Sequence, residues 1–265
     1  MTNYRMKLSL YQIDAFANKV FEGNPAAVIP LENWLPAKTM QLIASENNLS
    51  ETAFFCLSDN NYEIRWFTPN GEIELCGHAT LASAYVLFNI LNYKTEQIEF
   101  NSLSGSLTVK KVNDLFRLDF PSQKPIKCKM PRLLTEGLGR ESNNCYKNED
   151  YLVVFETENE IVNINPDFNK LKKLDSRGVI ITAPGLNYDF VSRAFFPKYG
   201  ILEDPVTGSA HTKLIPYWAE KFGKSTLIAK QVSKRGGELF CENDKNRVYI
   251  SGHAKLYMKG EIEIN

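Results

Sequence analysis

The chain has 265 residues, and its 31 Lys and Arg balance its 31 Asp and Glu, so the formal net charge is zero. Hydrophobic residues make up 43% and charged residues 23% of the sequence, which is ordinary globular usage and excludes a mostly disordered or collagen-like chain. The length fits one or two domains, and the charge balance gives no electrostatic footprint for nucleic acid or an anionic membrane.

Targeting segments and cysteine frameworks are not expected either. The start of the chain leads into an alternating segment rather than an apolar signal region, and no apolar run reaches the roughly 18 residues of a membrane span. The five cysteines are widely spaced and form no C-x-x-C pair, which argues against a disulfide framework or a cysteine-rich zinc site. A reducing cytoplasm is the simplest expectation.

The first quarter of the chain alternates strand patterns with one helix pattern. A helix is predicted over 36–47, where apolar residues recur at helical spacing and Pro36 suits the first turn. A turn is predicted at 58–61 from its polar residues. Strands are predicted over 8–14, 26–29, 52–57 and 62–67.

The segment 78–91 is the most informative predicted helix. It is apolar on nearly every side, and a soluble helix of that kind must be enclosed by the rest of its domain. The pattern therefore favours a central helix wrapped by a sheet. Antiparallel hairpins are predicted over 97–120, and the Pro-containing segment 121–127 is the expected linker near the midpoint.

The second half of the chain is predicted to repeat the first. Helices are expected over 165–174, with an Asn cap and Pro at its first position, and over 208–222, before Gly223; strands are expected at 151–155, 178–182 and 189–196. Phe67, Gly71 and Glu74 have the spacing of Phe196, Gly200 and Glu203, and Arg65 and Arg193 precede them. A lag near half the chain predicts two similar lobes rather than a solenoid.

Both lobes place a glycine-bearing turn before a predicted buried helix, at 76–80 and at 204–211. A helix start offers free N–H groups and the positive end of the dipole, so two such ends could hold a small carboxylate. We expect an anion near Gly77–His78 or Gly208–Ser209. Taken singly, each motif is equally compatible with simple helix capping.

Several ionisable residues are candidates for proton transfer. Glu51 precedes an apolar strand, where desolvation could make it a general base, or it could be a solvated loop residue. His78 could relay protons or cap a helix, and Asp204 could transfer a second proton or fix a turn. Cys76, at a helix start, could have a depressed pKa or be simply buried, and His211 could join the site or only pack.

Metal and nucleotide chemistry is not expected from these motifs. The three histidines lack H-x-x-x-H or H-E-x-x-H spacing, and the glycines form neither a dinucleotide fingerprint nor a phosphate loop. We therefore expect no metal and no organic cofactor.

A set of motifs resembles one known family. G-N-P-A-A-V (23–28), L-S-E-T-A-F (49–54), R-W-F-T-P (65–69), L-C-G-H-A-T (75–80) and E-D-P-V-T-G-S-A-H (203–211) occur in order, followed by S-K-R-G-G-E-L (233–239) and I-S-G-H-A (250–254). Together they resemble the phenazine-biosynthesis-like (PhzF-like) isomerases. Thr212-Lys213 is a departure, because small or apolar residues are common there in the family.

The resemblance implies an α+β fold of the diaminopimelate-epimerase type. Two pseudo-symmetric lobes, each a mostly antiparallel sheet rolled around a central buried helix, would have the active site in the cleft between them. The lobes are expected at 1–121, joined by a last strand at about 255–265, and at 122–254. The resemblance leaves a homodimer open.

The resemblance also implies roles for individual residues. Glu51 corresponds to the catalytic acid/base, while His78, Asp204 and Ser209 would bind substrate and handle protons, and Gly77 and Gly208 would present backbone N–H groups. The expected partner is a small, carboxylate-bearing, cyclic or amino-acid-like molecule, isomerised without a cofactor.

Two alternatives stay open. One is a two-base amino-acid epimerase that uses Cys76 with Glu51 or Asp204, although the position matching Cys76 in the second lobe lies near Pro205, which is neither acid nor base. The other is a non-catalytic paralogue that binds a small ligand.

Overall fold

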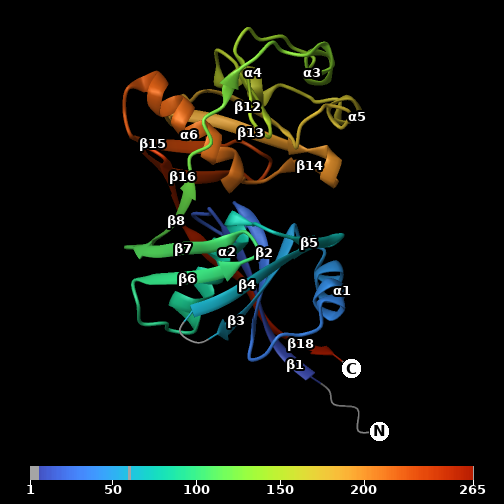
Figure 1. Cartoon of the computed structure of the whole chain (residues 1–265), viewed down its shortest axis with the longest axis vertical. Coiled ribbons are helices and arrows are strands. Elements are labelled where there is room, and N and C mark those ends of the chain that lie inside the picture. The colour runs from blue at the N-terminus through green and yellow to red at the C-terminus, as the bar shows by residue number, and fades with distance from the viewer. Residues whose placement is uncertain (1–5, 59–60, 265) are drawn as a thin grey trace. The chain divides into compact units, whose positions relative to one another are not determined.

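A computed structural model describes residues 6–58 and 61–264 (Figure 1). Residues 1–5, where the sequence predicts no targeting segment, lie outside the described residues. So do residues 59–60 of the turn predicted at 58–61. The chain divides into two compact units: unit 1 comprises residues 1–119 and 251–265, and unit 2 comprises residues 120–250. Both boundaries between the units fall inside strands, namely β8 (Leu115–Pro121) and β17 (Arg247–Gly252).

The described residues of unit 1 form a sheet, two α-helices and a π-helical turn. Its elements are β1 (Met6–Ala15), β2 (Asn24–Leu31), α1 (Ala37–Asn47), β3 (Glu51–Ser58), β4 (Asn61–Thr68), β5 (Gly71–Ile73), α2 (Gly77–Tyr85), the π-helical turn Val86–Ile90, β6 (Gln97–Ser102), β7 (Gly105–Val112), most of β8 (Leu115–Pro121) and β18 (Ala254–Ile264).

Unit 2 has a similar mixture. Its elements are β9 (Ile126–Lys127), α3 (Arg132–Leu138), β10 (Cys145–Lys147), β11 (Tyr151–Val154), α4 (Glu158–Val162), α5 (Phe168–Leu171), β12 (Val179–Pro184), β13 (Phe190–Phe196), a 3-10 turn (Pro197–Tyr199), β14 (Ile201–Asp204), α6 (Gly208–Phe222), β15 (Thr226–Gln231), β16 (Gly237–Asp244) and most of β17 (Arg247–Gly252).

The strand pairings confirm the internal repeat. In unit 1, β1 and β2 are antiparallel, β2 and β3 parallel, β3 and β4 antiparallel, β4 and β6 parallel, and β6 and β7 antiparallel. In unit 2 the same alternation runs through β10, β11, β12, β13, β15 and β16. A short strand also pairs antiparallel with β4 and with β13, namely β5 and β14. The expected α+β class with two similar lobes is therefore correct.

The central helix of unit 1 is buried as its composition predicts. Every residue of α2 from His78 to Ala84 is buried, and the helix contacts β1, β2, β3 and β7. Figure 1 shows α2 among the strands of unit 1, with α1 on the outside of the sheet. The predicted helix 78–91 changes to π-helical geometry at Val86, a detail that the apolar pattern does not contain.

Two predicted segments of unit 2 differ from expectation. The helix expected at 165–174 shortens to Phe168–Leu171, because Asp167 rather than Asn165 is the cap: its side chain accepts from the N–H groups of Asn169 and Lys170. The expected linker 121–127 is partly ordered by pairing, since Ile126 and Lys127 form β9 against β10.

Pro216 lies inside α6 and explains one hydrogen bond that holds the linker 121–127. Proline has no N–H, so the carbonyl of Thr212, four residues earlier, receives no helical hydrogen bond from it. That carbonyl instead accepts from the backbone N–H of Gln123 at 3.0 Å. The entry of the chain into unit 2 is thereby tied to α6.

Candidate active site

Glu51 and Asn24 begin two neighbouring parallel strands of unit 1. Glu51 is the first residue of β3, where the register places it beside Ala26 of β2, and Asn24 is the first residue of β2. Parallel neighbours start at the same edge of a sheet, so both polar side chains lie at one edge. Glu51 is only 6% exposed and Asn24 is fully buried. Glu51 is therefore the desolvated carboxylate that the apolar strand after it suggests.

Cys76 and His78 come from the start of α2. Cys76 is the N-cap residue, and its carbonyl accepts from both the backbone N–H of Thr80 at 3.1 Å and the hydroxyl of Thr80 at 2.6 Å. His78 is the second residue of the helix and is 6% exposed. The first turn of α2 thus fixes both side chains on a rigid element.

These side chains form one buried cluster around the ring of His78. Its Nε2 lies 3.0 Å from Oε2 of Glu51, within ion-pair distance although not aligned as a hydrogen bond. On the other side of the ring, Nδ1 lies 3.3 Å from Nδ2 of Asn24 and 3.5 Å from Sγ of Cys76. Sequence reasoning missed Asn24, although it belongs to the motif at 23–28.

The charge state of the cluster follows from burial and neighbours. Burial opposes a charge on His78, but Cys76 and Glu51 outweigh it and hold the pKa of His78 well above its ordinary value. Burial, together with the Glu51 carboxylate, raises the pKa of the Cys76 thiol. The depressed pKa considered for a cysteine at a helix start is therefore wrong here. A protonated thiol carries no charge, so the Cys76 part of the upward shift in the pKa of His78 applies where the thiol is ionised, and the Glu51 carboxylate supplies the rest.

This arrangement can hold and pass a proton away from bulk water. As an imidazolium, His78 presents Nε2–H to Glu51 and Nδ1–H toward the sulfur of Cys76. With Nδ1 unprotonated, the same nitrogen can accept from the amide of Asn24. Both protonation states of His78 thus have neighbours in the cluster.

Unit 2 holds the other predicted residues in the segment between β14 and α6. Asp204 ends β14 and is 8% exposed, and it accepts from the hydroxyl of Thr207, the N-cap residue of α6, at 2.5 Å. Gly208 and Ser209 are the first two residues of that helix. The aspartate and the helix start are therefore held next to each other.

Gln231 and Ser233 hold the segment between β14 and α6 by hydrogen bonds to its backbone. The fully buried side chain of Gln231 donates to the carbonyl of Asp204 at 2.7 Å and accepts from the N–H of Thr207 at 2.9 Å. The hydroxyl of Ser233 donates to the carbonyl of Pro205 at 2.7 Å. In the sequence, the only signal for these two residues is the motif at 233–239, which begins with Ser233 and follows Gln231.

Ser209 is linked to a buried charge network. Its hydroxyl accepts from Arg177 at 3.1 Å, and Arg177 donates two hydrogen bonds to the fully buried Asp150 at 2.9 and 2.6 Å. Nζ of the fully buried Lys213 lies 3.2 Å from Asp150 and 3.2 Å from the carbonyl of Ser209. Lys213, noted above as a departure from the family pattern, is thus part of the support of Ser209.

The burial of that network shifts its ionisation. Burial opposes the charge of Asp150, but the hydrogen bonds and charges of Arg177 and Lys213 together outweigh burial and lower the pKa of the carboxyl. Burial lowers the pKa of Lys213, although Asp150 opposes this shift. The pairing of opposite charges is what makes burial of these groups tolerable.

His211 lies in α6 and is fully buried. Its Nδ1 lies 2.7 Å from the carbonyl of Thr207, and its ring packs against Phe190. Burial lowers the pKa of His211 to about 4 despite the carbonyl. A neutral, carbonyl-bound ring fits the packing alternative for this residue.

The geometry revises two equivalences between the halves. Arg65 pairs with Glu72 at 2.7 Å and Arg193 pairs with Glu203 at 2.7 Å, so Glu72, not Glu74, is the counterpart of Glu203. Likewise Cys76 caps α2 and Thr207 caps α6, so the counterpart of Cys76 is Thr207 rather than Pro205. Neither Thr207 nor Pro205 is a cysteine, so neither candidate counterpart of Cys76 supplies a second thiol.

One group of potential metal donors occurs among the described residues. A carboxylate oxygen of Glu51, Sγ of Cys76 and a ring nitrogen of His78 all lie within 4.8 Å of one another, and all three residues are buried. The sequence spacing alone does not indicate this set, because Glu51 comes from a different element.

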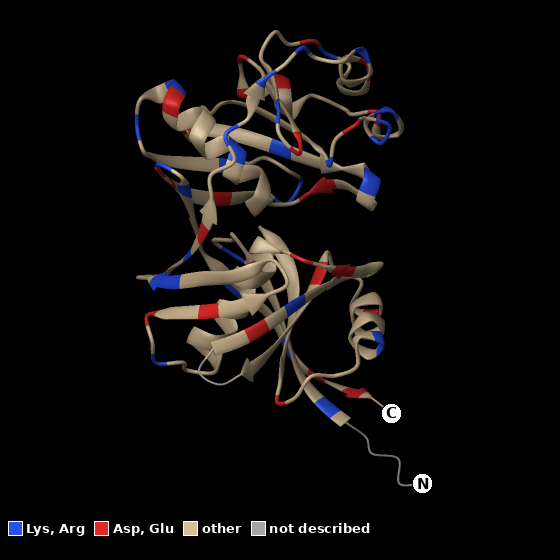
Figure 2. Cartoon of the chain, in the orientation of Figure 1, with Lys and Arg blue, Asp and Glu red and all other residues tan. Residues whose placement is uncertain are grey.

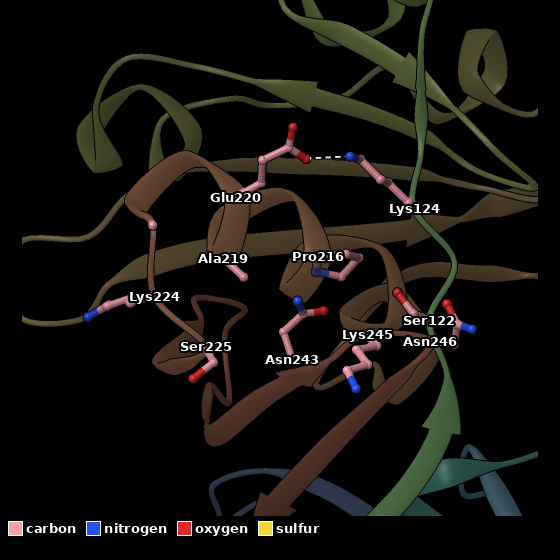
Figure 3. Close-up of a pocket in the computed structure, with 11 residues that line it drawn as sticks. Ser122, Lys124, Pro216, Ala219, Glu220, Lys224, Ser225, Asn243, Lys245 and Asn246 are labelled. Atoms are coloured by element: carbon pink, nitrogen blue, oxygen red, sulfur yellow. Dashed lines mark ion pairs between the residues drawn. The ribbon is translucent and has the colours of Figure 1, made fainter.

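A cleft of about 500 Å³ lies elsewhere in unit 2, at the C-terminal part of α6 (Figure 3). The ion pair between Lys124 and Glu220, at 2.5 Å, lies at its side, and the amide of Asn243 is among its lining groups. None of the predicted site residues lines it. We therefore do not assign it to the candidate active site.

The distribution of charged residues along the chain agrees with the balanced composition. Figure 2 shows basic and acidic residues interspersed along the elements of both units. Within residues 6–58 and 61–264, no helix is both long and apolar enough to cross a membrane.

Comparison with known proteins gives a consistent match over nearly the whole chain. Residues 13–260 match the family model described as phenazine biosynthesis-like protein. The chain is 49% identical over 259 residues to an uncharacterized isomerase of Pseudomonas aeruginosa, covering 98% of this chain and 100% of the relative.

Solved structures agree. A crystal structure of a phenazine biosynthesis protein of the PhzF family from Enterococcus faecalis has 51% identity and a TM-score of 0.95, covering 97% of this chain and 99% of that chain. A hydroxyproline epimerase from Agrobacterium vitis, at 7% identity and a TM-score of 0.66, covers 97% of this chain and 93% of its own. That last likeness shows a shared epimerase-type fold alone.

Proposed function

Because the chain belongs to the family of phenazine biosynthesis-like proteins and is an isomerase, we propose that it moves a proton on a small carboxylate-bearing substrate, with Glu51 as the acid/base. The observation that carries this proposal is the buried Glu51 carboxylate facing His78 at 3.0 Å. A carbon-bound proton is a weak acid, so its removal needs a positioned base that is shielded from water.

The proposed step begins with proton removal by Glu51. The Glu51 carboxylate accepts a proton from a substrate carbon, and the carboxyl group returns a proton to a different carbon. His78, whose pKa is raised, stabilises the Glu51 carboxylate before the first transfer and again after the second, and it can exchange a proton with it. The N–H groups at the start of α2, near Gly77, would orient the substrate carboxylate.

We propose that Asp204, Gly208 and Ser209 of unit 2 are substrate-binding residues. Family resemblance supports this part of the proposal, together with the rigidity of the segment. Gln231 holds the backbone of Asp204 and Thr207, and Arg177 holds the hydroxyl of Ser209. Groups held in this way lose little conformational freedom when a ligand binds.

Substitution of Glu51 by Gln tests the proposal. Gln has nearly the same shape but cannot accept the proton, so the variant should fold and bind ligand nearly as the wild type does. Turnover should fall by about 10²–10⁴-fold or more if Glu51 is the sole base. Small cyclic and amino carboxylates would first be screened for binding, and then for exchange of a carbon-bound proton in deuterated solvent.

Glu63→Gln is the matched control. Glu63 lies on the neighbouring strand β4, where its carboxylate accepts from the indole N–H of Trp34 at 2.7 Å, and a Gln oxygen can keep that bond. The control should keep wild-type turnover. Wild-type turnover in the Glu51 variant would show that the proposed mechanism is wrong.

An epimerase that uses Cys76 is the second candidate. Sγ of Cys76 lies 3.5 Å from Nδ1 of His78, so a protonated thiol is placed in the same cluster. Alkylation of the cysteine separates the two candidates only if compared with Cys76→Ala. Loss of activity in both would favour the cysteine mechanism, whereas activity retained in Cys76→Ala would leave Glu51 as the base.

Three further properties belong to the proposal. We propose that the isomerase acts without a cofactor, is cytoplasmic and forms a homodimer; the five cysteines, all free, are compatible with a reducing compartment. Light scattering of the purified protein tests the dimer. A ligand that binds without any solvent-deuterium incorporation would instead favour a non-catalytic paralogue.

A further inference from the structure

The cluster around His78 combines three chemically different donors. A carboxylate, a thiol and an imidazole, from Glu51, Cys76 and His78, lie with one donor atom each within 4.8 Å of one another. Zinc takes these ligand types at roughly 2.0–2.3 Å, so ligands of one ion lie roughly 3–4 Å apart. Small side-chain movements would therefore suffice to surround one ion.

Two donors of the cluster also lack hydrogen bonds. Oε2 of Glu51 and Nε2 of His78 are buried and make no hydrogen bond with any described group, although they face each other at 3.0 Å. Buried polar atoms of this kind are usually satisfied by a partner, water or an ion. Because these two atoms already face each other as an ion pair, an ion that binds here would replace that pairing with bonds to both atoms.

The backbone that carries the donors is fixed. Glu51 begins β3 within the parallel pairing with β2, and the Cys76 carbonyl is held twice by Thr80. His78 lies in the first turn of the same buried helix. Little ordering would therefore be required when an ion binds.

We propose that Glu51, Cys76 and His78 form a binding site for one Zn²⁺ ion, which inhibits the isomerase by occupying its acid/base. On binding, the Cys76 thiol and any imidazolium release their protons to solvent, and the ion ligates thiolate, imidazole and carboxylate. A fourth position is left for water, as in zinc sites with three protein ligands. The binding claim stands by itself, while the inhibition claim rests on the proposed function of Glu51.

A pair of neighbouring thiols in unit 2 is an alternative site at which zinc could bind among the described residues. Sγ of Cys128, the residue after β9, lies 3.6 Å from Sγ of Cys145, the first residue of β10, and the backbone N–H of Cys128 donates to the carbonyl of Cys145. Cys128→Ala is therefore the stringent control for Cys76→Ala, because each variant removes one sulfur from one candidate site.

The test is calorimetric titration of the full, chelator-treated chain with Zn²⁺. We expect one ion per chain, affinity reduced at least tenfold in Cys76→Ala and in His78→Gln, and affinity unchanged in Cys128→Ala. Mg²⁺, which prefers oxygen ligands, should not bind at comparable concentration. Loss of binding in Cys128→Ala with retention in Cys76→Ala would overturn the proposal, as would the absence of zinc binding.

Cobalt gives a readout whose first measurement is made on the wild-type protein and so needs no variant. Co²⁺ bound to wild-type protein should give a thiolate-to-metal charge-transfer band, and that band should persist in Cys128→Ala; its absence from the wild type would overturn the site. The two proposals fail separately. Zinc that binds at Cys76 without inhibiting, in a protein whose Glu51→Gln variant is fully active, would refute the proposed function and keep the metal site.

Discussion

His78 and His211 are both buried, yet their surroundings shift their pKa values in opposite directions. His78 faces the carboxylate of Glu51, which helps to raise its pKa well above the ordinary value in spite of burial. His211 has a backbone carbonyl and an aromatic ring beside it, and burial lowers its pKa to about 4. Charge in the neighbourhood, rather than depth, decides which histidine can hold a proton.

This contrast predicts distinct titrations. In a ring-labelled sample followed by NMR, His78 should remain an imidazolium through neutral pH, while His211 should stay neutral until the pH approaches about 4. Glu51→Gln should lower the pKa of His78 and leave that of His211 unchanged, which makes His211 the internal control. A neutral His78 at pH 6 would contradict the charge assignment.

The same shifts have consequences for stability. The raised pKa of His78 stabilises the folded state below its unfolded pKa of about 6.5, and this contribution is lost as pH rises through the folded pKa. The lowered pKa of His211 acts in the other direction: stability is lost as pH falls from about 6.5 toward about 4, because only the unfolded state takes up the proton.

At the scale of elements, the turn between β1 and β2 positions one member of the site. Asp14 accepts from the N–H of Phe21 at 2.8 Å, and Gly23 adopts a φ of +67° directly before Asn24. A Cβ at Gly23 would lie 2.1 Å from the carbonyl oxygen of Ala15, so this position needs glycine both for its φ and for space. The turn therefore fixes where Asn24 meets His78.

Gly23→Ala should be more destabilising than Gly223→Ala. Gly223 ends α6 with a φ of +66° but has open space around a Cβ, so its replacement should cost only the left-handed strain of roughly 1–2 kcal/mol. Gly23→Ala adds a backbone clash to the same strain. Urea unfolding measures both free energies, and the His78 NMR signal should move only in Gly23→Ala. Equal losses in the two variants would contradict this account.

At the scale of the whole molecule, the two units differ in the number of chain segments that form them. Unit 2 is one continuous stretch, whereas unit 1 needs its last strand from the end of the chain. β18 pairs with β1 along Met6–Ala15, and Ile262 and Ile264 pack against the core cluster that includes Leu10 and Phe54. Unit 1 is therefore incomplete until residue 264 has been made.

A chain that ends at Gly252 should lose unit 1 selectively. Removal of β18 leaves β1 without one of its two neighbours and uncovers part of that core, while the core of unit 2, around Leu134 and Val153, keeps all its members. Hydrogen exchange read by mass spectrometry should show lost protection in unit 1 and retained protection in unit 2, the internal control. Equal loss in both units would refute the assignment of separate cores.

Local chemistry was sufficient to predict much of this protein. The all-apolar segment around Leu81 could only be an enclosed helix, and alternating segments with polar turns could only be hairpins. The repeat at half the chain length predicted two similar sheets, and the motifs around Glu51, His78 and Asp204 identified the family. These features depend on periodicity and on short motifs, which are written along the chain.

Tertiary structure decided which of these residues meet. Glu51 and His78 come from different elements, so no spacing in the sequence predicts their 3.0 Å contact or the donor set that they form with Cys76. Likewise Arg177, Asp150 and Lys213 support Ser209 only because packing brings three distant segments together. The opposite pKa shifts of His78 and His211 depend on burial and on the groups that folding brings beside each ring, which are properties of the folded chain and not of either residue's neighbours in the sequence.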